Sequence, residues 1–139
     1  MRWDLAAGWL AKADEDLGVA EVVLEGRLPT YGAVRFHAQQ AAEKALKALL
    51  VRHQIPFGRT HDLGELLQLA EPHEPGIAEV LAEAEALTPY AVRDRYPTSD
   101  PPVPREDASS HLTTARKTVG HVRSVLKPYL DAGRPGTGR

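Results

Sequence analysis

The chain has 139 residues, of which 42% are hydrophobic and 26% charged, enough for one domain with a single buried core. Its formal net charge is −2, which argues against capture of nucleic acid by a bulk positive field but leaves room for a local basic cleft. The absence of cysteine excludes disulfides and thiolate catalysis, and no apolar run approaches the roughly 20 residues of a membrane span. We therefore expect a cytoplasmic protein without membrane contact.

The first half of the chain predicts two long helices. In residues 4–25 the apolar side chains recur at steps of three or four, as on one face of a helix: Trp9, Ala13, Leu17, Ala20 and Leu24. Gly26 and Pro29 predict the end of this helix. Thr30 can cap a second helix that runs to about His53, and its broad apolar arc predicts a central place in a bundle.

Two shorter helices and a long irregular segment follow. Thr60 or Asp62 can cap the next helix, with Glu65 three residues after Asp62 in the spacing of a capping box, and Pro72 closes this helix. Residues 75–87 predict a fourth helix. The segment 88–104 contains five prolines and is predicted to be irregular. Irregular segments of this length in a compact domain are often functional.

A last helix is predicted from Pro104 onward, with Pro128 ending or bending it. Its apolar residues form a heptad seam suited to packing along another helix: Ala108, Leu112, Ala115, Val119, Val122, Leu126 and Tyr129. The glycine-rich residues 132–139 are predicted to be a flexible tail after a domain of residues 1–131. Without a convincing strand, the chain is predicted to be an all-α, antiparallel up-and-down bundle of four to five helices.

The second helix carries the first candidate site. Four polar residues form one strip on this helix, because each lies three or four positions from another: Gln40, Glu43, Lys44 and Lys47. The simplest interpretation is a solvated strip with a surface ion pair from Glu43 to Lys47. In the alternative, Gln40, Lys44 and Lys47 contact a ligand or partner, or Arg35 and His37 face a dimer cleft together with Gln40.

The irregular segment carries the second candidate site. Arg93 and Arg95 could bind phosphate while Tyr96 stacks on a nucleotide or RNA base. Equally, Arg95 could bridge helix ends and carboxylates while Tyr96 packs. At the start of the third helix, His61-Asp62 is favoured as a helix cap with a hydrogen-bonded histidine.

Arg105 and His111 form a third candidate, because an arginine beside a neutral histidine can cleave RNA without a metal. Six residues of helix, however, turn about 600°, which leaves the two side chains about 120° apart. Chance spacing is the simpler explanation unless a cap position or a second subunit brings them together. The six histidines lack the spacing of metal ligands, so we expect neither a metal nor a cofactor.

Four segments together resemble the HEPN family of small helical domains, over roughly residues 3–130: Trp9 with Asp16-Leu17; Phe36-His37-Ala38-Gln39-Gln40-Ala41-Ala42-Glu43-Lys44-Ala45-Leu46-Lys47; Thr60-His61-Asp62-Leu63; and Arg95-Tyr96-Pro97. The second segment is the most specific. The resemblance implies an up-and-down bundle that forms a homodimer, with a polar cleft for nucleotide or RNA. It also implies a separately encoded minimal nucleotidyltransferase as partner, in a toxin–antitoxin-like pair.

The ribonuclease branch of that family carries an arginine, a polar residue and a histidine four to six positions beyond the arginine. Arg105-Glu106 with His111 meets the spacing, although glutamate replaces the usual Asn, Asp or His. The leading hypothesis is therefore a nucleotide- or RNA-binding partner of a nucleotidyltransferase, with Arg95 on phosphate and Tyr96 stacking. The alternatives are a metal-independent endoribonuclease toxin and a structural adaptor that associates through its heptad seam.

Overall fold

The fold is a bundle of helices, and the computed structural model describes residues 2–26, 30–91 and 102–133 of it. The helical elements follow one another as α1 (Arg2–Glu25), α2 (Tyr31–Arg52), α3 (Leu63–Ala70), α4 (Ile77–Val80), the 3₁₀ helix η1 (Ala82–Ala91) and α5 (Arg105–Asp131). No strand occurs in these ranges. The predicted all-α class is confirmed.

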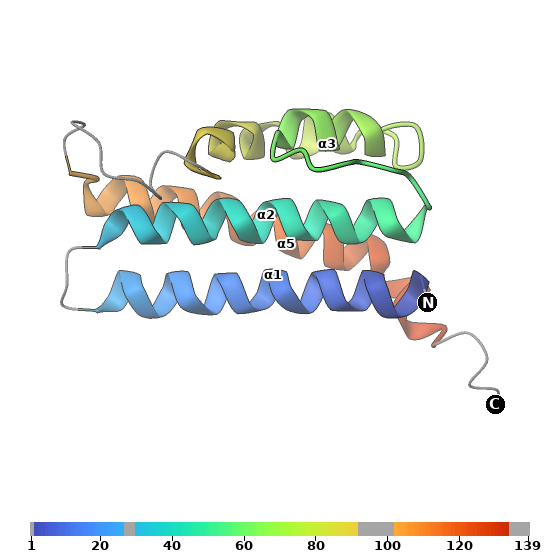
Figure 1. Cartoon of the computed structure of the whole chain (residues 1–139), viewed down its shortest axis with the longest axis horizontal. Coiled ribbons are helices and arrows are strands. Elements are labelled where there is room, and N and C mark those ends of the chain that lie inside the picture. Colours follow the sequence, from blue (N-terminus) through green and yellow to red (C-terminus); the bar gives the residue numbers. More distant parts are fainter. Residues whose placement is uncertain (1, 27–29, 92–101, 134–139) are drawn as a thin grey trace.

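Helix α2 is the centre of the bundle. It lies antiparallel beside α1, with α5 behind the pair and α3 and η1 along its other side (Figure 1). Its buried face is rich in alanine, and Ala38, Ala41 and Ala45 are fully inaccessible to solvent. Small side chains let the neighbouring helices approach α2 closely, while leucines such as Leu46 and Leu49 fill the core between them.

The termini of α1 and α3 follow the predicted signals. Helix α1 ends at Glu25, directly before Gly26. At the start of α3, the Asp62 carboxylate accepts a hydrogen bond from the backbone N–H of Glu65 at 3.2 Å. In a capping box the Glu65 carboxylate would in turn accept a hydrogen bond from the Asp62 backbone N–H. Here it accepts one from the Thr60 hydroxyl instead, at 2.8 Å.

The predicted fourth helix over residues 75–87 is wrong in its form. A single α-helical turn at Ile77–Val80 gives way to the 3₁₀ helix, which continues through Pro89 to Ala91. The tighter turn brings Thr88 to the start of α3, where its hydroxyl accepts the backbone N–H of Leu63 at 3.0 Å. Residues 88–91 of the segment predicted to be irregular are therefore helical, and its residues 92–101 lie outside the described residues.

Helix α5 continues through Pro128 to Asp131 rather than ending there. Residues 134–139 of the predicted tail lie outside the described residues, so the domain boundary at 131 stays a prediction. None of the described helices combines the length and apolar character needed to cross a membrane.

Candidate ligand-binding site

Asp16 of α1 joins the two long helices at the middle of the bundle. Its carboxylate accepts a hydrogen bond from His37 Nδ1 at 2.8 Å through Oδ1 and from Lys44 Nζ at 2.7 Å through Oδ2. Asp16 is 7% exposed, whereas the side chains of His37 and Lys44 are 28% and 23% exposed. The buried carboxylate thus orients two cationic or protonatable groups that reach the surface.

Glu43, the residue before Lys44 on α2, is the centre of a second network. Its carboxylate accepts from Lys47 Nζ at 2.8 Å, from Gln39 Nε2 at 2.8 Å and from His61 Nδ1 at 2.9 Å. The fully buried Gln39 in turn accepts a hydrogen bond from Gln40 Nε2 at 2.7 Å. The network therefore connects the buried interior of α2 with the half-exposed Gln40 and the exposed His61.

The chemistry of this network keeps Glu43 ionised. Burial acts to raise the pKa of the Glu43 carboxyl, but the hydrogen bonds from Lys47, Gln39 and His61 favour the charged form more strongly, and the pKa is lowered overall. An ionised carboxylate can only accept hydrogen bonds, so the proton of His61 is on Nδ1. The Nε2 atom of His61 is left for contacts outside the network.

Lys47 is held beneath the surface. Its ammonium group lies 5.6 Å from the ring centre of Trp9 and 5.4 Å from that of Phe57, and the two rings meet edge to face at 6.4 Å. These contacts add cation–π attraction to the ion pair with Glu43. Because Lys47 is only 6% exposed, a ligand at the surface meets Lys44 first.

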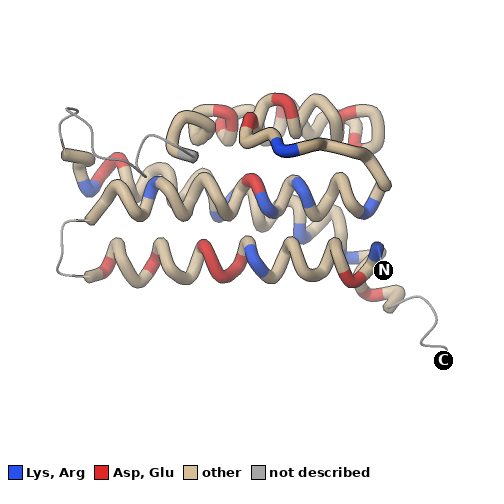
Figure 2. The backbone as a smooth tube through the Cα atoms, in the orientation of Figure 1, with Lys and Arg blue, Asp and Glu red and all other residues tan. Residues whose placement is uncertain are grey.

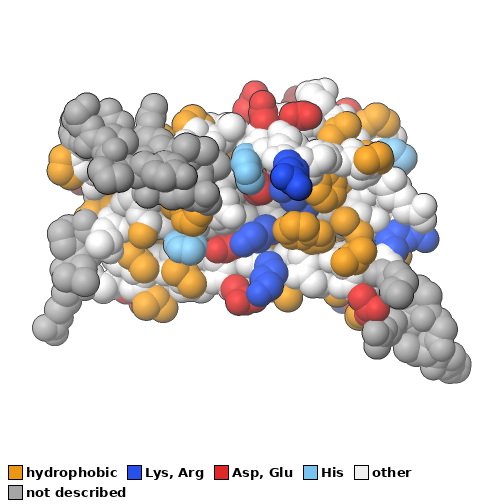
Figure 3. Space-filling view, in the orientation of Figure 1, with side chains coloured by type: hydrophobic (Ala, Val, Ile, Leu, Met, Phe, Trp, Pro, Cys, Tyr) orange, Lys and Arg blue, Asp and Glu red, His pale blue; other side chains and the backbone are white. Residues whose placement is uncertain are grey.

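The predicted solvated strip is therefore wrong for half of its members, since Glu43 and Lys47 are buried. Helical periodicity placed the strip on one side of α2, but only packing shows that Trp9, Phe57 and the 60–62 segment cover that side. Figure 2 shows charged positions near the middle of both α1 and α2. Figure 3 shows charged and histidine side chains in the same region of the surface, with hydrophobic side chains beside them. We call Asp16, His37, Gln39, Gln40, Glu43, Lys44, Lys47 and His61 the polar network.

The second candidate site, Arg93, Arg95 and Tyr96, lies outside the described residues. Near it in the sequence, Tyr90 carries contacts that sequence reasoning missed. The guanidinium of Arg35 lies 4.1 Å from the Tyr90 ring centre, and the His111 ring lies 4.8 Å from the same ring. This stack joins α2, η1 and α5, and no sequence signal pointed to it because the three residues come from three separate elements.

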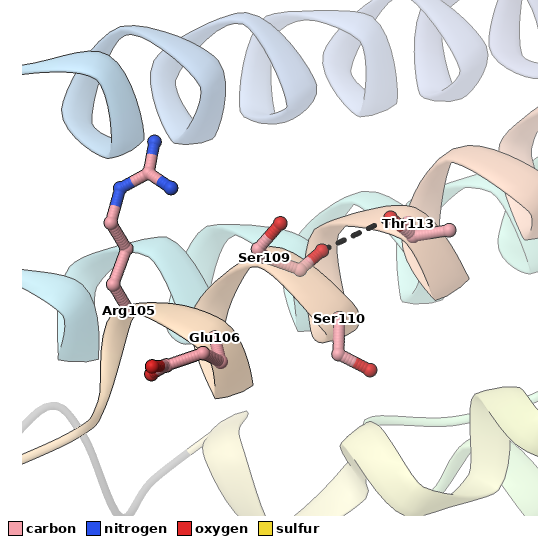
Figure 4. A pocket seen from close by; sticks show the side chains of 5 residues that line it. All are labelled: Arg105, Glu106, Ser109, Ser110 and Thr113. Atoms are coloured by element: carbon pink, nitrogen blue, oxygen red, sulfur yellow. Dashed lines mark hydrogen bonds between the residues drawn. The ribbon is translucent and has the colours of Figure 1, made fainter.

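Arg105 and His111 lie on different sides of α5. Arg105 lines a pocket of about 440 Å³ with Glu106, Ser109, Ser110 and Thr113. Figure 4 shows the Arg105 side chain extending toward α1 and that of Ser110 pointing away from it. His111 instead packs on Tyr90. The arrangement agrees with the angle of about 120° expected from helical geometry.

The structure gives the positions of possible metal ligands in the part of the chain that it describes. There, no group of three or more His, Cys, Asp or Glu side chains is placed to hold an ion. His53 lies 3.5 Å from a Glu74 oxygen, and its ring centre is 5.0 Å from that of His73. Burial and the neighbouring Arg52 lower the pKa of His53, which favours its neutral form.

The fold and the polar network define a small helical domain with a buried ionic centre shared by two long helices. A family model described as the HEPN domain matches residues 6–125. The chain therefore belongs to the HEPN family, and the resemblance found in its sequence is confirmed.

Two relatives agree with this assignment. Putative toxin MJ1304 of Methanocaldococcus jannaschii is 27% identical, over 86% of this chain and 86% of its own. The crystal structure of ST0689, an archaeal HEPN homologue, superposes with a TM-score of 0.70 at 28% identity, and the match covers 87% of this chain and 97% of that one. The fold is thus shared with the archaeal HEPN homologue along nearly its whole length.

Proposed function

We propose that this protein binds a nucleotide or RNA on the exposed edge of the polar network and acts in a toxin–antitoxin-like pair with a separately encoded minimal nucleotidyltransferase. The observation that carries the proposal is the convergence of three separated segments. Asp16, residues 37–47 and His61 come from α1, α2 and the α2–α3 connection, and they form two hydrogen-bonded sets side by side on α2, one around Asp16 and one around Glu43.

The exposed edge has donors suited to a phosphate or a base. Lys44 has three N–H donors and gives one to Asp16, so two remain for a ligand. His37 uses Nδ1 for Asp16, which leaves Nε2 directed away from that bond. Gln40 offers an amide that can recognise a base edge. Arg95 and Tyr96 are proposed, on the sequence alone, to add phosphate and stacking contacts, while Lys47 supports the edge from beneath.

The electrostatics favour a specific ligand over a long nucleic acid held by charge. Within the polar network the two lysines are matched by Asp16 and Glu43, in line with the overall charge of −2. A balanced site attracts phosphate only at short range, through directional hydrogen bonds. A nucleotide or a short single-stranded RNA therefore fits better than a duplex.

A toxin–antitoxin-like role is supported by the name of the Methanocaldococcus jannaschii relative, which is described as a toxin. The nucleotidyltransferase partner and the homodimer come from the family resemblance. We propose them for this chain together, with the homodimer as the form that meets the partner.

Calorimetry with a panel of nucleotides and a short single-stranded RNA tests the proposal. Replacing both Lys44 and Arg95 by alanine should weaken binding by roughly tenfold or more, since each removes a charge-assisted hydrogen bond. Lys127→Ala is the matched control, because Lys127 is an exposed lysine on α5 that pairs with Asp131. No binding by the parent protein, alone or with its partner, would refute the proposal and favour the adaptor.

A second function, a metal-independent endoribonuclease, is favoured by the toxin name of the relative and by the pocket at Arg105. It requires Arg105 and His111 to act on one phosphate, which their positions on α5 allow only with help from a second subunit. Expression in a host should then arrest growth, and His111→Ala should abolish the arrest while the protein stays folded. Arrest that persists in His111→Ala would remove this pair from the mechanism.

A further inference from the structure

The outer face of α1 carries apolar side chains that the fold does not bury. Leu5, Val19 and Val22 are 58%, 42% and 72% exposed, and they are three of the four large hydrophobic side chains that are exposed among the described residues. They share one strip with Gly8, Lys12 and Glu15, because residues seven apart nearly coincide on a helix. Over 17 residues this strip is about 25 Å long.

Helix α1 contains two glycines, Gly8 and Gly18, that its packing within the chain does not require. A side chain added at Gly8 or Gly18 would meet no atom within 4 Å, so no neighbouring helix requires these glycines. Glycine inside a helix costs about 1 kcal/mol relative to alanine. At both sites the bare backbone opens a shallow hollow, of about 390 Å³ at Gly8 and about 500 Å³ at Gly18.

The residues that line the two hollows correspond to one another when the direction of α1 is reversed about the point between residues 13 and 14. A two-fold axis that relates two copies of the chain can pass through this point. The first is lined by Asp4, Leu5, Gly8, Trp9 and Lys12, and the second by Val23, Val22, Val19, Gly18 and Glu15, so each residue of one set has its counterpart in the other. In an antiparallel pair of α1 helices, Leu5 would face Val22 and Gly8 would face Val19. The surface is therefore complementary to itself.

The charges follow the same symmetry. Lys12 and Glu15 form an exposed pair at 3.4 Å within one chain, with side chains 64% and 67% exposed. About the same axis, Lys12 of one copy faces Glu15 of the other, so two ion pairs form across the centre of the strip. Like charges would meet in the parallel arrangement, which disfavours it.

We infer that α1 is the surface on which two copies of this chain associate, antiparallel about that axis. The inference rests on the homodimer of the proposed function but not on ligand binding. One helix face is small for a permanent interface, so the dimer forms and dissociates with concentration. Trp9 lines the first hollow and also contacts Lys47 of the polar network, so each ligand site of the dimer lies beside the interface.

The test of this surface is to reverse the charges of Lys12 and Glu15 and to measure self-association by sedimentation velocity over a range of concentrations. Lys12→Glu and Glu15→Lys should each weaken association of the chain with itself at least tenfold, because like charges then meet twice across the axis. An equimolar mixture of the two variants should associate as the parent does, since every facing pair becomes opposite in charge. The double variant K12E/E15K should also recover the dimer.

Lys127→Glu, on the exposed face of α5, is the control and should leave association unchanged. A parent chain that stays monomeric at all concentrations, single variants that associate as the parent does, or a mixture that fails to associate would each overturn the assignment. Circular dichroism establishes that the variants remain folded. Nucleotide binding is measured separately on the same variants, and because Lys12 and Glu15 lie outside the polar network, loss of dimer and loss of binding are distinguishable.

Discussion

At the scale of single residues, Glu43 illustrates how packing changes the meaning of a sequence pattern. By spacing, Glu43 and Lys47 are an ordinary ion pair one turn apart, which on a surface is worth a few tenths of a kcal/mol. Buried beneath Trp9 and Phe57, the same pair carries charges that must stay matched. Removing one member then leaves an uncompensated buried charge, which typically costs about 3–5 kcal/mol.

Glu43→Gln should therefore lower the free energy of unfolding by about 3 kcal/mol at pH 7, measured by urea denaturation. The pH dependence follows from the lowered pKa of Glu43. The stabilisation by ionised Glu43 is complete above pH 4.5, the ordinary pKa of a glutamate. It is lost as the pH falls through the lower pKa of Glu43 in the folded state, since the unfolded chain takes up the proton first.

Glu43→Gln should reduce the loss of stability in that acidic window. Gln68→Glu, at an exposed position of α3, is a control that adds a solvated carboxyl and should leave the window unchanged. A parent and a Glu43→Gln variant with the same dependence on pH would contradict an ionised, stabilising Glu43.

At the scale of elements, the short helix α3 has little stability of its own and depends on its ends. A helix of 8 residues is far below the length that is stable alone in water. Asp62 caps its first turn, Thr88 of η1 accepts the Leu63 N–H, and the preceding His61 is tied to Glu43 of α2. The position of α3 and the cover over the polar network are thus set together.

Asp62→Ala should cost about 1 kcal/mol through loss of the cap, measured by thermal or urea unfolding. Asp62→Asn keeps a capping oxygen without the charge and should recover most of that loss. If asparagine were as destabilising as alanine, the contribution of Asp62 would come from its charge rather than from the hydrogen bond to Glu65.

At the scale of the whole molecule, α2 explains why a single domain can hold so many polar groups inside. Its alanines let α1 and α5 approach closely. Gln39, Glu43 and Lys47 are buried, with Trp9, Phe57 and His61 against the last two. Each of these groups is therefore satisfied by a neighbour rather than by solvent. The outer face of α1 carries exposed apolar side chains around the Lys12–Glu15 pair, and this is the face on which we infer that a second copy associates.

The sequence by itself determined the helical class, the extents of α1, α2 and α5 to within a few residues, a cap at Thr60 or Asp62, and the family. These depend on local periodicity, on caps and breakers, and on segments whose order along the chain is specific. The form of α4 and η1 was missed, because a 3₁₀ turn packed against α3 has no local signal that separates it from an α-helix.

Only the tertiary structure decided that Asp16, His37 and Lys44 share one carboxylate and that Lys47 lies buried between aromatic rings. Only it showed that Arg35 and His111 meet on Tyr90. The physical reason is that burial and long-range hydrogen bonds depend on which helix faces pack together, whereas helical periodicity specifies a face without naming the neighbour that covers it.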